Sequence, residues 1–402
     1  MKKNKVPEIR FSGFTDDWEL RKLGEYVIIK SGWSPSNFEV TDEMGSLFIK
    51  VDDLNYSKRI QSDSILKVNI HPKYKKLKKG STLFPKRGAA IMTNKVRILG
   101  DDGYMDTNMM ALEPNGIDSE FLYTFIARTG LYKIADTSTI PQINNKHIEP
   151  YEISLPKLKE QIEIGSFFKK LDNTIALHQR ELEILKNTKK AFLQKMFPKE
   201  GEKVPEVRFP GFMDDWELRK LEYLGKVTTG KAFSSTDFDE NGEYLIITNK
   251  DISDSSRSQN TVTDRINTYD NKVISKYNLS GENLLVTMDG VNLGKTAKYS
   301  NNKALLAQRV GRIQSEQIEF VYQVTANQAF LSTMRTLSVG NAIKHISLKQ
   351  IADYKSLVPN NKDEQAQIGN FFKKLDNTIA LHQRELTILQ NTKKAFLQKM
   401  FV

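Results

Sequence analysis

The segment from Phe167 to Phe197 reads FFKKLDNTIALHQRELEILKNTKKAFLQKMF, and almost the same letters return from Phe371 to Phe401. The second copy differs from the first at only two positions, where Thr387 stands for Glu183 and Gln390 stands for Lys186. A repeat this long and this close indicates that its residues perform the same task twice.

A shorter repeat precedes each copy, as VPEIRFSGFTDDWELRKL from Val6 to Leu23 and VPEVRFPGFMDDWELRKL from Val204 to Leu221. Between the matched segments lie two stretches of similar length, ending near Pro156 and Pro359, that barely resemble each other. A recent duplication alone would leave these stretches alike, so we infer that the repeats are held constant while the variable stretches change. This layout suits a chain that docks the same partner twice and reads two different things.

The longer repeat has the apolar periodicity of a long helix. From Glu160 to Phe197 apolar residues follow a 4-3 alternation, interrupted on the same seam by His178 and Lys189. Such a heptad pattern predicts a helix that pairs with another helix. The predicted pairing or partner-binding residues of the two copies are Phe168, Leu171, Ile175, Leu182, Leu185, Phe192, Phe372, Leu375, Ile379, Leu386, Leu389 and Phe396.

A helix of this length, roughly 55 Å at 1.5 Å per residue, cannot bury its apolar stripe alone. Its natural mate is the second copy, Glu364 to Phe401, in an antiparallel coiled coil with a pseudo-two-fold axis. Other apolar residues would remain exposed, namely Leu177, Ile184, Leu193 and their copies Leu381, Ile388 and Leu397. We interpret His178 and His382, at matching seam positions, as packed or register-setting residues and assign no metal site.

The variable stretches share a faint plan. Short apolar strands, LFIKVDDL from Leu47 and LIITNKDI from Leu245, run into acidic turns, and helices are predicted near Ser119–Arg128 and Glu319–Gln328. The predicted fold is α+β: two globular α/β domains joined by two long helices that form an antiparallel coiled coil. The predicted boundaries are 1–155 for an arm plus the first variable domain, 156–198 for a central helical region, 199–358 for an arm plus the second variable domain, and 359–402 for a C-terminal helical region.

The composition limits the classes of protein to which this chain can belong. The 402 residues are 39% hydrophobic and 27% charged, as in globular proteins, and they include no cysteine. Disulfides, thiolate metal sites and a cysteine nucleophile are therefore excluded. We see neither a signal peptide behind the basic start nor an apolar run of membrane-spanning length, and we expect a cytoplasmic protein.

The charge points to a polyanionic partner. The net charge is +11, and Lys67–Arg97 and Gly290–Gln314 contain many basic residues but no Asp or Glu. Acid-free basic runs in both variable stretches favour nucleic-acid binding over an ordinary solvated face. The predicted DNA-binding residues are Lys73, Lys75, Lys76, Lys78, Lys79, Lys86 and Arg87, with Asn292, Lys295, Gln308, Arg309 and Lys344. Most lysines should contact phosphate, while Arg, Asn and Gln are better suited to base edges.

No catalytic residues are predicted. The segment Gly290-Val-Asn-Leu-Gly-Lys295-Thr296 resembles a P-loop, but it has three residues between its glycines where four are needed, and Asp289 stands in place of the first glycine. Signatures of an amino-methyltransferase, a dinucleotide site, a nuclease or a metal cluster are also missing from the sequence.

Taken together, these motifs resemble the specificity subunit of a type I restriction–modification system. The resemblance covers nearly the whole chain: the arms ending in FTDDWELRKL and FMDDWELRKL, LPKLKEQIEIG and SLVPNNKDEQAQIG before the long helices, and the blocks GSTLF and GENLL with Gly88 and Gly290. Each motif alone is weak, whereas the order of arm, variable domain and helix, repeated twice, is specific.

The resemblance implies two target-recognition domains, each reading one half of an asymmetric, bipartite site in double-stranded DNA. The helices would dock two modification subunits and set the spacer between the half-sites. S-adenosylmethionine for adenine methylation, ATP and Mg would belong to the modification and restriction subunits, and this chain would hold no cofactor. The helix length agrees with this picture, because it exceeds the about 34–36 Å of one DNA turn.

Two other interpretations remain open. The chain could be a stand-alone nucleic-acid-binding scaffold that self-associates through its long helices, and it would then bind nucleic acid tightly without a partner. It could also be a structural scaffold with incidental basic patches, whose binding would show no sequence preference. An enzyme acting alone is the weakest option.

Overall fold

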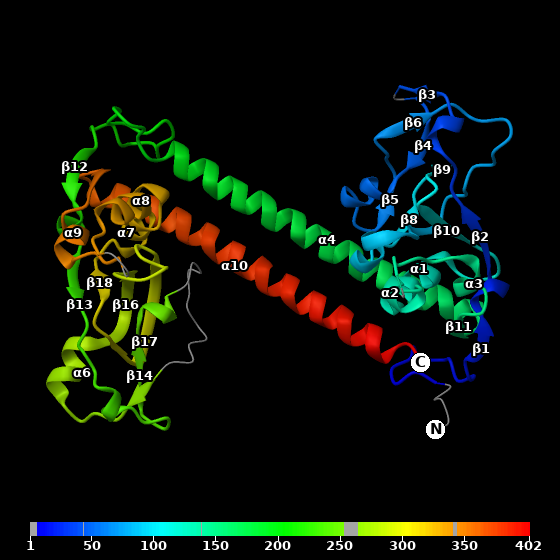
Figure 1. The fold of residues 1–402 in the computed structure, drawn as a ribbon. Helices are drawn as coiled ribbons and strands as arrows, with labels where there is room; N and C mark the ends of the chain where they lie inside the picture. Colours follow the sequence, from blue (N-terminus) through cyan, green and yellow to red (C-terminus); the bar gives the residue numbers. More distant parts are fainter. Residues whose placement is uncertain (1–5, 43, 138, 253–263, 341–343) are drawn as a thin grey trace. The chain divides into compact units, whose positions relative to one another are not determined.

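The computed structural model describes residues 6–42, 44–137, 139–252, 264–340 and 344–402, and the chain divides into two compact units. Unit 1 comprises residues 1–180 with 384–402, and unit 2 comprises residues 181–383. The two longest helices, α4 (Leu158–Lys195) and α10 (Lys362–Lys399), each contribute residues to both units (Figure 1). No helix among the described residues is long and apolar enough to cross a membrane.

The described residues of unit 1 form three sheets. The arm strand β1 (Glu19–Lys22) pairs antiparallel with β11 (Glu152–Leu155). A five-stranded sheet has the order β2 (Val27–Ser31), β10 (Met109–Pro114), β7 (Thr82–Pro85), β8 (Arg97–Leu99) and β5 (Ile60–Gln61). A four-stranded sheet has the order β3 (Val40–Thr41), β6 (Leu66–Val68), β4 (Ser46–Ile49) and β9 (Gly103–Met105). The helices of this part are α1 (Ser119–Thr129), α2 (Leu131–Ile134) and α3 (Asn145–Ile148), with 3-10 turns at Leu23–Glu25, Pro35–Asn37, Val51–Asn55 and Gly88–Thr93.

The core of unit 1 forms where α1 packs against β7 and β8. Helix α1 begins at Asp118, whose carboxylate accepts hydrogen bonds from the backbone N–H groups of Glu120 and Phe121 and so caps the helix. The segment after α10 completes this core, because the Phe401 ring stacks on Phe121 at 5.4 Å between centroids. Residues from the beginning and the end of the sequence thus share one core.

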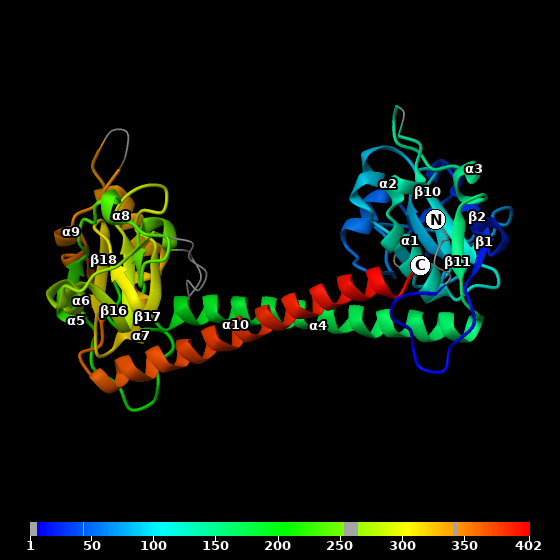
Figure 2. The ribbon, with the colours of Figure 1, turned by 90° about the horizontal axis from the view of Figure 1, so that it is seen from below.

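Unit 2 repeats the arm pairing, with β12 (Glu217–Lys220) antiparallel to β19 (Lys355–Val358). One six-stranded sheet follows the order β13 (Lys226–Thr229), β18 (Val310–Gln314), β16 (Asn278–Thr287), β17 (Thr296–Leu306), β14 (Tyr244–Ile247) and β15 (Arg265–Ile266). Its helices are α5 (Leu221–Leu224), α6 (Asn271–Tyr277), α7 (Ile318–Thr325), α8 (Gln328–Leu337) and α9 (Leu348–Ala352), and 3-10 turns span Ser235–Asp237 and Asn249–Asp251. Helix α7 packs on β16 and β17 (Figure 2). Helix α9 contacts β13.

The core of unit 2 matches that of unit 1 ring for ring. Phe197, just after α4, stacks on Phe320 of α7 at 6.0 Å and meets Trp216 edge-on at 5.6 Å. Trp216 is almost fully buried. The predicted internal repeat is therefore confirmed at the level of individual contacts.

The long helices pair antiparallel inside each unit, as the heptad pattern predicts. In unit 1 Phe167 meets Phe396 at 5.1 Å, and in unit 2 Phe192 meets Phe371 at 5.0 Å between ring centroids. All twelve predicted pairing residues are buried or half-buried. The predicted antiparallel coiled coil is confirmed in this sense.

Two details of the sequence-based expectation are wrong. Leu193 and Leu397 are half-buried and not exposed, because they pack against the cores of units 2 and 1 respectively. The helix predicted at Glu319–Gln328 ends at Thr325, since the side chain of Asn327 accepts a hydrogen bond from Phe330 N and caps the separate helix α8.

The acidic turns after the first strands are confirmed. Strand β4 ends at Ile49, and the Asp53 carboxylate accepts a hydrogen bond from Lys50 N at 2.7 Å. In unit 2, Asp251 accepts from Thr248 N at 2.8 Å in the same way. These carboxylates close a 3-10 turn in each unit and fix the direction in which the chain leaves the sheet.

Candidate nucleic-acid interface

The first group of predicted DNA-binding residues, Lys73–Lys79, lies on a loop that packs on an aromatic cluster. The ring of Tyr74 stacks on His71 at 4.4 Å and meets Phe38 at 5.4 Å. Leu77 is buried and bridges to Gly103 of β9. Apolar anchoring therefore fixes this loop while its lysine side chains stay at the surface.

The lysines of this loop differ in their partners. The ammonium of Lys78 lies 3.0 Å from the Glu113 carboxylate, and that of Lys79 lies 3.5 Å from Asp101. Lys73 and Lys75 are exposed, and Lys76 is half-buried. The acid-free run in the sequence is thus partly neutralised by acids from other segments of unit 1.

Arg97, the last cation of the same run, has a structural role. Its guanidinium is buried and donates hydrogen bonds to the carbonyl oxygens of Leu54 and Ser57, both at 2.7 Å. Burial lowers the pKa of Arg97 below its ordinary value. This side chain fastens the turn at Val51–Asn55 and does not belong to a surface.

The second group in unit 1, Lys86 and Arg87, lies where two loops are joined by backbone hydrogen bonds. Lys86 N donates to the carbonyl oxygen of Asn108 at 2.8 Å, Gly88 N to Pro141 O at 2.8 Å, and Ile143 N to Lys86 O at 2.9 Å. Burial and the neighbouring Arg87 lower the pKa of Lys86. Arg87 itself is exposed.

Unit 2 contains the same framework built from different residues. Met288 N donates to Arg309 O at 3.1 Å, Gly290 N to Lys344 O at 3.4 Å, and Ile346 N to Met288 O at 2.8 Å. Single β-bridges also correspond, between Arg87 and Gln142 and between Asp289 and His345. The backbone therefore aligns the following pairs: Lys86 with Met288, Arg87 with Asp289, and Asn108 with Arg309.

The predicted residues of unit 2 gather around this framework. Gln308, Arg309 and Lys344 are exposed, whereas Asn292 and Lys295 are half-buried in the turn between β16 and β17. Gln308 N donates to the carbonyl oxygen of Lys231 at 2.8 Å, which brings a further exposed lysine beside them. Residues 341–343, just before Lys344, lie outside the described residues, as does Ser138 in unit 1.

The resemblance of Gly290–Thr296 to a P-loop is confined to the sequence and does not extend to the structure. Its turn is closed by hydrogen bonds from Lys295 N to Asn292 O at 2.9 Å and from Gly294 N to Thr287 O at 2.9 Å. A P-loop needs a helix after the loop, whereas this turn leads into strand β17.

A carboxylate held between two cations recurs beneath each variable domain. Glu120 accepts hydrogen bonds from Arg59 and Lys169, and Glu319 accepts from Lys298 at 2.7 Å and pairs with Lys373 at 2.9 Å. Burial raises the pKa of Glu319, but its two lysine partners outweigh burial and hold the pKa below its ordinary value. Lys298, one of the cations in the second basic run, therefore has a structural role.

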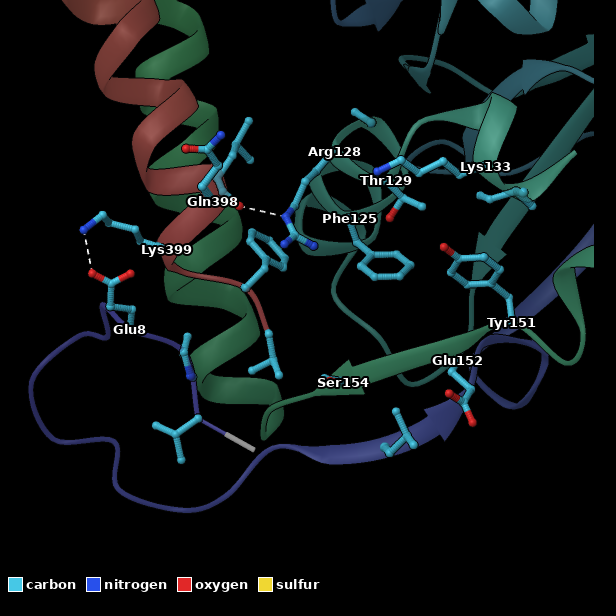
Figure 3. Close-up of a pocket in the computed structure, with 18 of the residues that line it drawn as sticks. Glu8, Phe125, Arg128, Thr129, Lys133, Tyr151, Glu152, Ser154, Gln398 and Lys399 are labelled. Atoms are coloured by element: carbon cyan, nitrogen blue, oxygen red, sulfur yellow. Dashed lines mark hydrogen bonds and ion pairs between the residues drawn. The ribbon is translucent and has the colours of Figure 1, made fainter. Parts of the chain in front are cut away.

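A pocket of about 1500 Å³ lies in unit 1 between the arm, α1, β11 and the end of α10 (Figure 3). Lys399 faces Glu8 at 2.5 Å, and Arg128 Nε donates to the carbonyl oxygen of Leu397 at 2.7 Å. His147, also at its wall, accepts a hydrogen bond from Asn144 N at its Nδ1 atom. These polar groups connect neighbouring segments of unit 1, so we assign them a structural role.

Sequence reasoning missed Asp289 and Asn249, which stand beside Arg309. Asn249 Nδ2 donates a hydrogen bond to Asp289 Oδ1, and Arg309 Nη1 donates to Asp289 Oδ2 at 3.1 Å. The available signal was that Asp289 immediately precedes an acid-free basic run. Its significance becomes visible only when the backbone brings Arg309 against it.

Comparisons with known proteins agree with the internal repeat. The model of a family described as "Type I restriction modification DNA specificity domain" matches residues 15–187 and again residues 213–391. The chain is similar to the MjaVIII specificity subunit of a type I restriction enzyme from Methanocaldococcus jannaschii, with 25% identity over 95% of this chain and 91% of that one. Its fold is similar to the crystal structure of a type I restriction-modification S subunit from M. genitalium, with a TM-score of 0.65, 13% identity and 99% of both chains covered.

Proposed function

The chain belongs to the type I restriction–modification DNA specificity family, and on that premise we propose that units 1 and 2 each read one half of an asymmetric, split DNA sequence. The chain is the component that supplies specificity, and catalysis belongs to other components of the system. Type I restriction–modification complexes and DNA are its partners in the general sense that the family name gives.

The observation that carries this proposal is one backbone framework with two sets of side chains. Three matched hydrogen bonds and one matched β-bridge hold Arg87 and Asn108 in unit 1, and Asp289 and Arg309 in unit 2. Base edges are distinguished by the pattern of donors and acceptors that a protein presents. Different side chains on one framework therefore support two different half-sites.

Exposed and half-buried lysines of each unit support the contact with the DNA backbone. In unit 1 these are Lys73, Lys75 and Lys86, and in unit 2 they are Lys231 and Lys344. Cations of this kind release counterions from phosphate, set the register of the protein on the duplex and carry no sequence information.

We further propose that the constant helices dock two modification subunits, one for each repeat. Four apolar side chains support this, because equivalent residues are exposed to the same degree: Leu177 is 55% exposed, Leu381 54%, Ile184 54% and Ile388 53%. Unit 1 carries Leu177 and Ile388, and unit 2 carries Ile184 and Leu381. Exposed apolar residues kept in both copies fit a partner that binds twice.

The docking proposal is tested by the composition of the purified complex. Leu177→Glu with Ile388→Glu alters unit 1 only, and Ile184→Glu with Leu381→Glu alters unit 2 only. We expect native mass spectrometry to find two modification subunits on the wild type, one on either double variant and none on the quadruple variant. Exposed Lys190→Glu and Lys394→Glu, on the same helices, form the matched control and should keep both. Two subunits on the quadruple variant would refute docking at these residues.

Cofactors and spacer length complete the proposal. S-adenosylmethionine, ATP and Mg would be bound by the modification and restriction subunits, and the length of α4 and α10 would set the number of unread bases. Inserting the same whole number of turns into both helices should therefore lengthen the spacer in the methylated motif. An unchanged spacer with retained methylation would contradict this role of the helices.

The function itself is tested by a map of modified bases in host DNA with the gene intact and deleted. We expect a split, asymmetric adenine-methylation motif to disappear on deletion and to return when the gene is restored. Methylation that does not change, in a strain that carries an active modification subunit, would refute the proposal. Tight nucleic-acid binding by the isolated chain would then favour a self-associating scaffold.

A further inference from the structure

Arg309 is an exposed arginine held in an unusual backbone conformation. Its φ angle is +63°, in the left-handed region that residues with a side chain seldom occupy. Its side chain is 65% exposed, so burial does not explain the strain. Residues in such sparsely populated conformations persist where the surrounding structure holds them, and they cluster at functional sites.

Two side chains fix that direction. Arg309 Nη1 donates to Asp289 Oδ2 at 3.1 Å, and the other oxygen of Asp289 accepts a hydrogen bond from Asn249 Nδ2. Asp289 is only 15% exposed. Asn249 belongs to the 3-10 turn that Asp251 closes behind strand β14. The guanidinium is therefore positioned by two linked hydrogen bonds, from Asn249 of this 3-10 turn to Asp289 and from Arg309 to Asp289.

The remaining donors of the guanidinium have no protein partner among the described residues, and the Arg309 side chain is 65% exposed. An arginine carries five N–H donors in a planar fork, and in the described part of the chain Asp289 engages the Nη1 group. A fork of this geometry matches O6 and N7 of guanine in the major groove, the commonest specific contact between proteins and DNA. We propose that Arg309 reads a guanine in the half-site of unit 2, with Asp289 as its positioning residue. This inference rests on the function proposed above.

The neighbourhood supports contact with a duplex at this point. Exposed Lys231 and Lys344 are joined to the framework through their carbonyl oxygens, which accept from Gln308 N at 2.8 Å and from Gly290 N at 3.4 Å. Exposed lysines beside a base-reading arginine suit contact with the phosphates of the same duplex.

The corresponding position of unit 1 carries different chemistry. Asn108 stands in place of Arg309, and its backbone N–H donates to the Asp106 carboxylate at 2.6 Å. Arg87 stands in place of Asp289. The same pair of framework positions thus carries an exposed arginine and a short amide in unit 1, and a carboxylate paired with an arginine in unit 2, as residues that determine specificity should.

The test is a motif map of DNA methylated by the complete complex carrying Arg309→Ala, Arg309→Lys or Asp289→Asn. We expect discrimination at one base pair of one half-site, a guanine in the wild type, to fall by about 10- to 100-fold in Arg309→Ala. Arg309→Lys should also relax that position, because a flexible ammonium lacks the rigid planar fork that Asp289 can hold in place. Asp289→Asn should relax the same position partially, while the other half-site stays unchanged in every variant.

The control is Arg335→Ala, which removes an exposed arginine from helix α8 of the same unit and should leave the motif intact. A uniform fall in methylation at all sequences for Arg309→Ala, with an unchanged motif, would assign Arg309 to phosphate and overturn the inference. A relaxed position that is not a guanine would overturn it as well. A wild-type complex without any split motif would instead refute the proposed function itself. Thermal melting of each variant separates loss of folding from loss of discrimination.

Discussion

The Lys189 ammonium lies 2.5 Å from the Asp376 carboxylate, and this ion pair joins the two long helices within unit 2. Lys393 and Asp172 form the equivalent pair in unit 1, also at 2.5 Å. Lys189 occupies a seam position that the heptad pattern reserves for an apolar residue. The interruption in the pattern is therefore a paired charge, and a charge at a seam position specifies the register of helices at some cost in stability.

The first prediction concerns this pair. Lys189→Ala should lower the free energy of unfolding of unit 2 by about 2–4 kcal/mol, because it leaves the largely buried Asp376 carboxylate without its cation. Urea denaturation followed by circular dichroism measures the change. The adjacent exposed Lys190→Ala is the control and should change stability by less than about 0.5 kcal/mol. Equal effects of the two variants would contradict the role assigned to the ion pair.

The second prediction concerns a buried carboxylate that each arm engages. Arg208 binds Glu364 through two hydrogen bonds at 2.7 and 2.8 Å, as Arg10 binds Glu160 at 2.6 and 2.7 Å. Glu364→Gln should destabilise unit 2 by about 3 kcal/mol, since the arginine loses its charge partner at a buried site. Hydrogen exchange should show lost protection in unit 2 peptides only, and Glu160→Gln should show it in unit 1. Unchanged exchange in both variants would refute an anchoring role for these carboxylates.

The third prediction concerns pH. Two lysine partners hold the pKa of Glu319 below its ordinary value of 4.5, against the opposing effect of burial. The stabilisation is thus present above about pH 4.5 and is lost as the pH falls through the lower pKa of the folded state. We expect Glu319→Gln to cost about 1–2 kcal/mol at pH 7 and the variant to converge with wild type near pH 3. Urea midpoints across this range test it, and exposed Glu240→Gln should follow wild type throughout. A gap that persists at low pH would contradict the linkage.

The fourth prediction separates two lysines of one loop. Lys75 is exposed, whereas Lys78 already lies 3.0 Å from Glu113. Lys75→Ala should weaken binding to all DNA sequences and reduce the slope of log K against log salt by about one, because one phosphate contact is lost. Lys78→Ala should reduce the slope by less. Fluorescence anisotropy at several salt concentrations measures both, and a larger loss for Lys78→Ala would reverse the assignment.

The helices and their pairing could be predicted because periodicity records which residues face a partner. The Asp376 partner of Lys189 could not, since it depends on the register of two helices far apart in the sequence. The same limit explains Arg97, which the sequence places in a basic run although the fold buries it. The sequence shows which residues are charged, but only the folded structure shows which of them lie at the surface.

The candidate site was likewise predictable from the sequence only in part. Gln308 and Arg309 were predicted from residue type and charge, and the structure places both at the surface. Asp289 was considered only as a missing glycine of a phosphate loop. Its pairing with Arg309 depends on backbone hydrogen bonds between strands that are distant in sequence, which no local pattern contains.

The packing of Phe401 against Phe121 has a consequence for synthesis. Residues 384–402 follow the whole of unit 2 in chain order, so a ribosome releases them only after residues 181–383 have been made. Unit 2 is one continuous segment and can fold as soon as that segment has been made. Unit 1 is begun first, but part of its apolar core stays exposed until the last helical turns have been made. At the usual about 5–20 residues per second that wait lasts roughly 10–45 seconds, during which the nascent unit 1 is most in need of a chaperone.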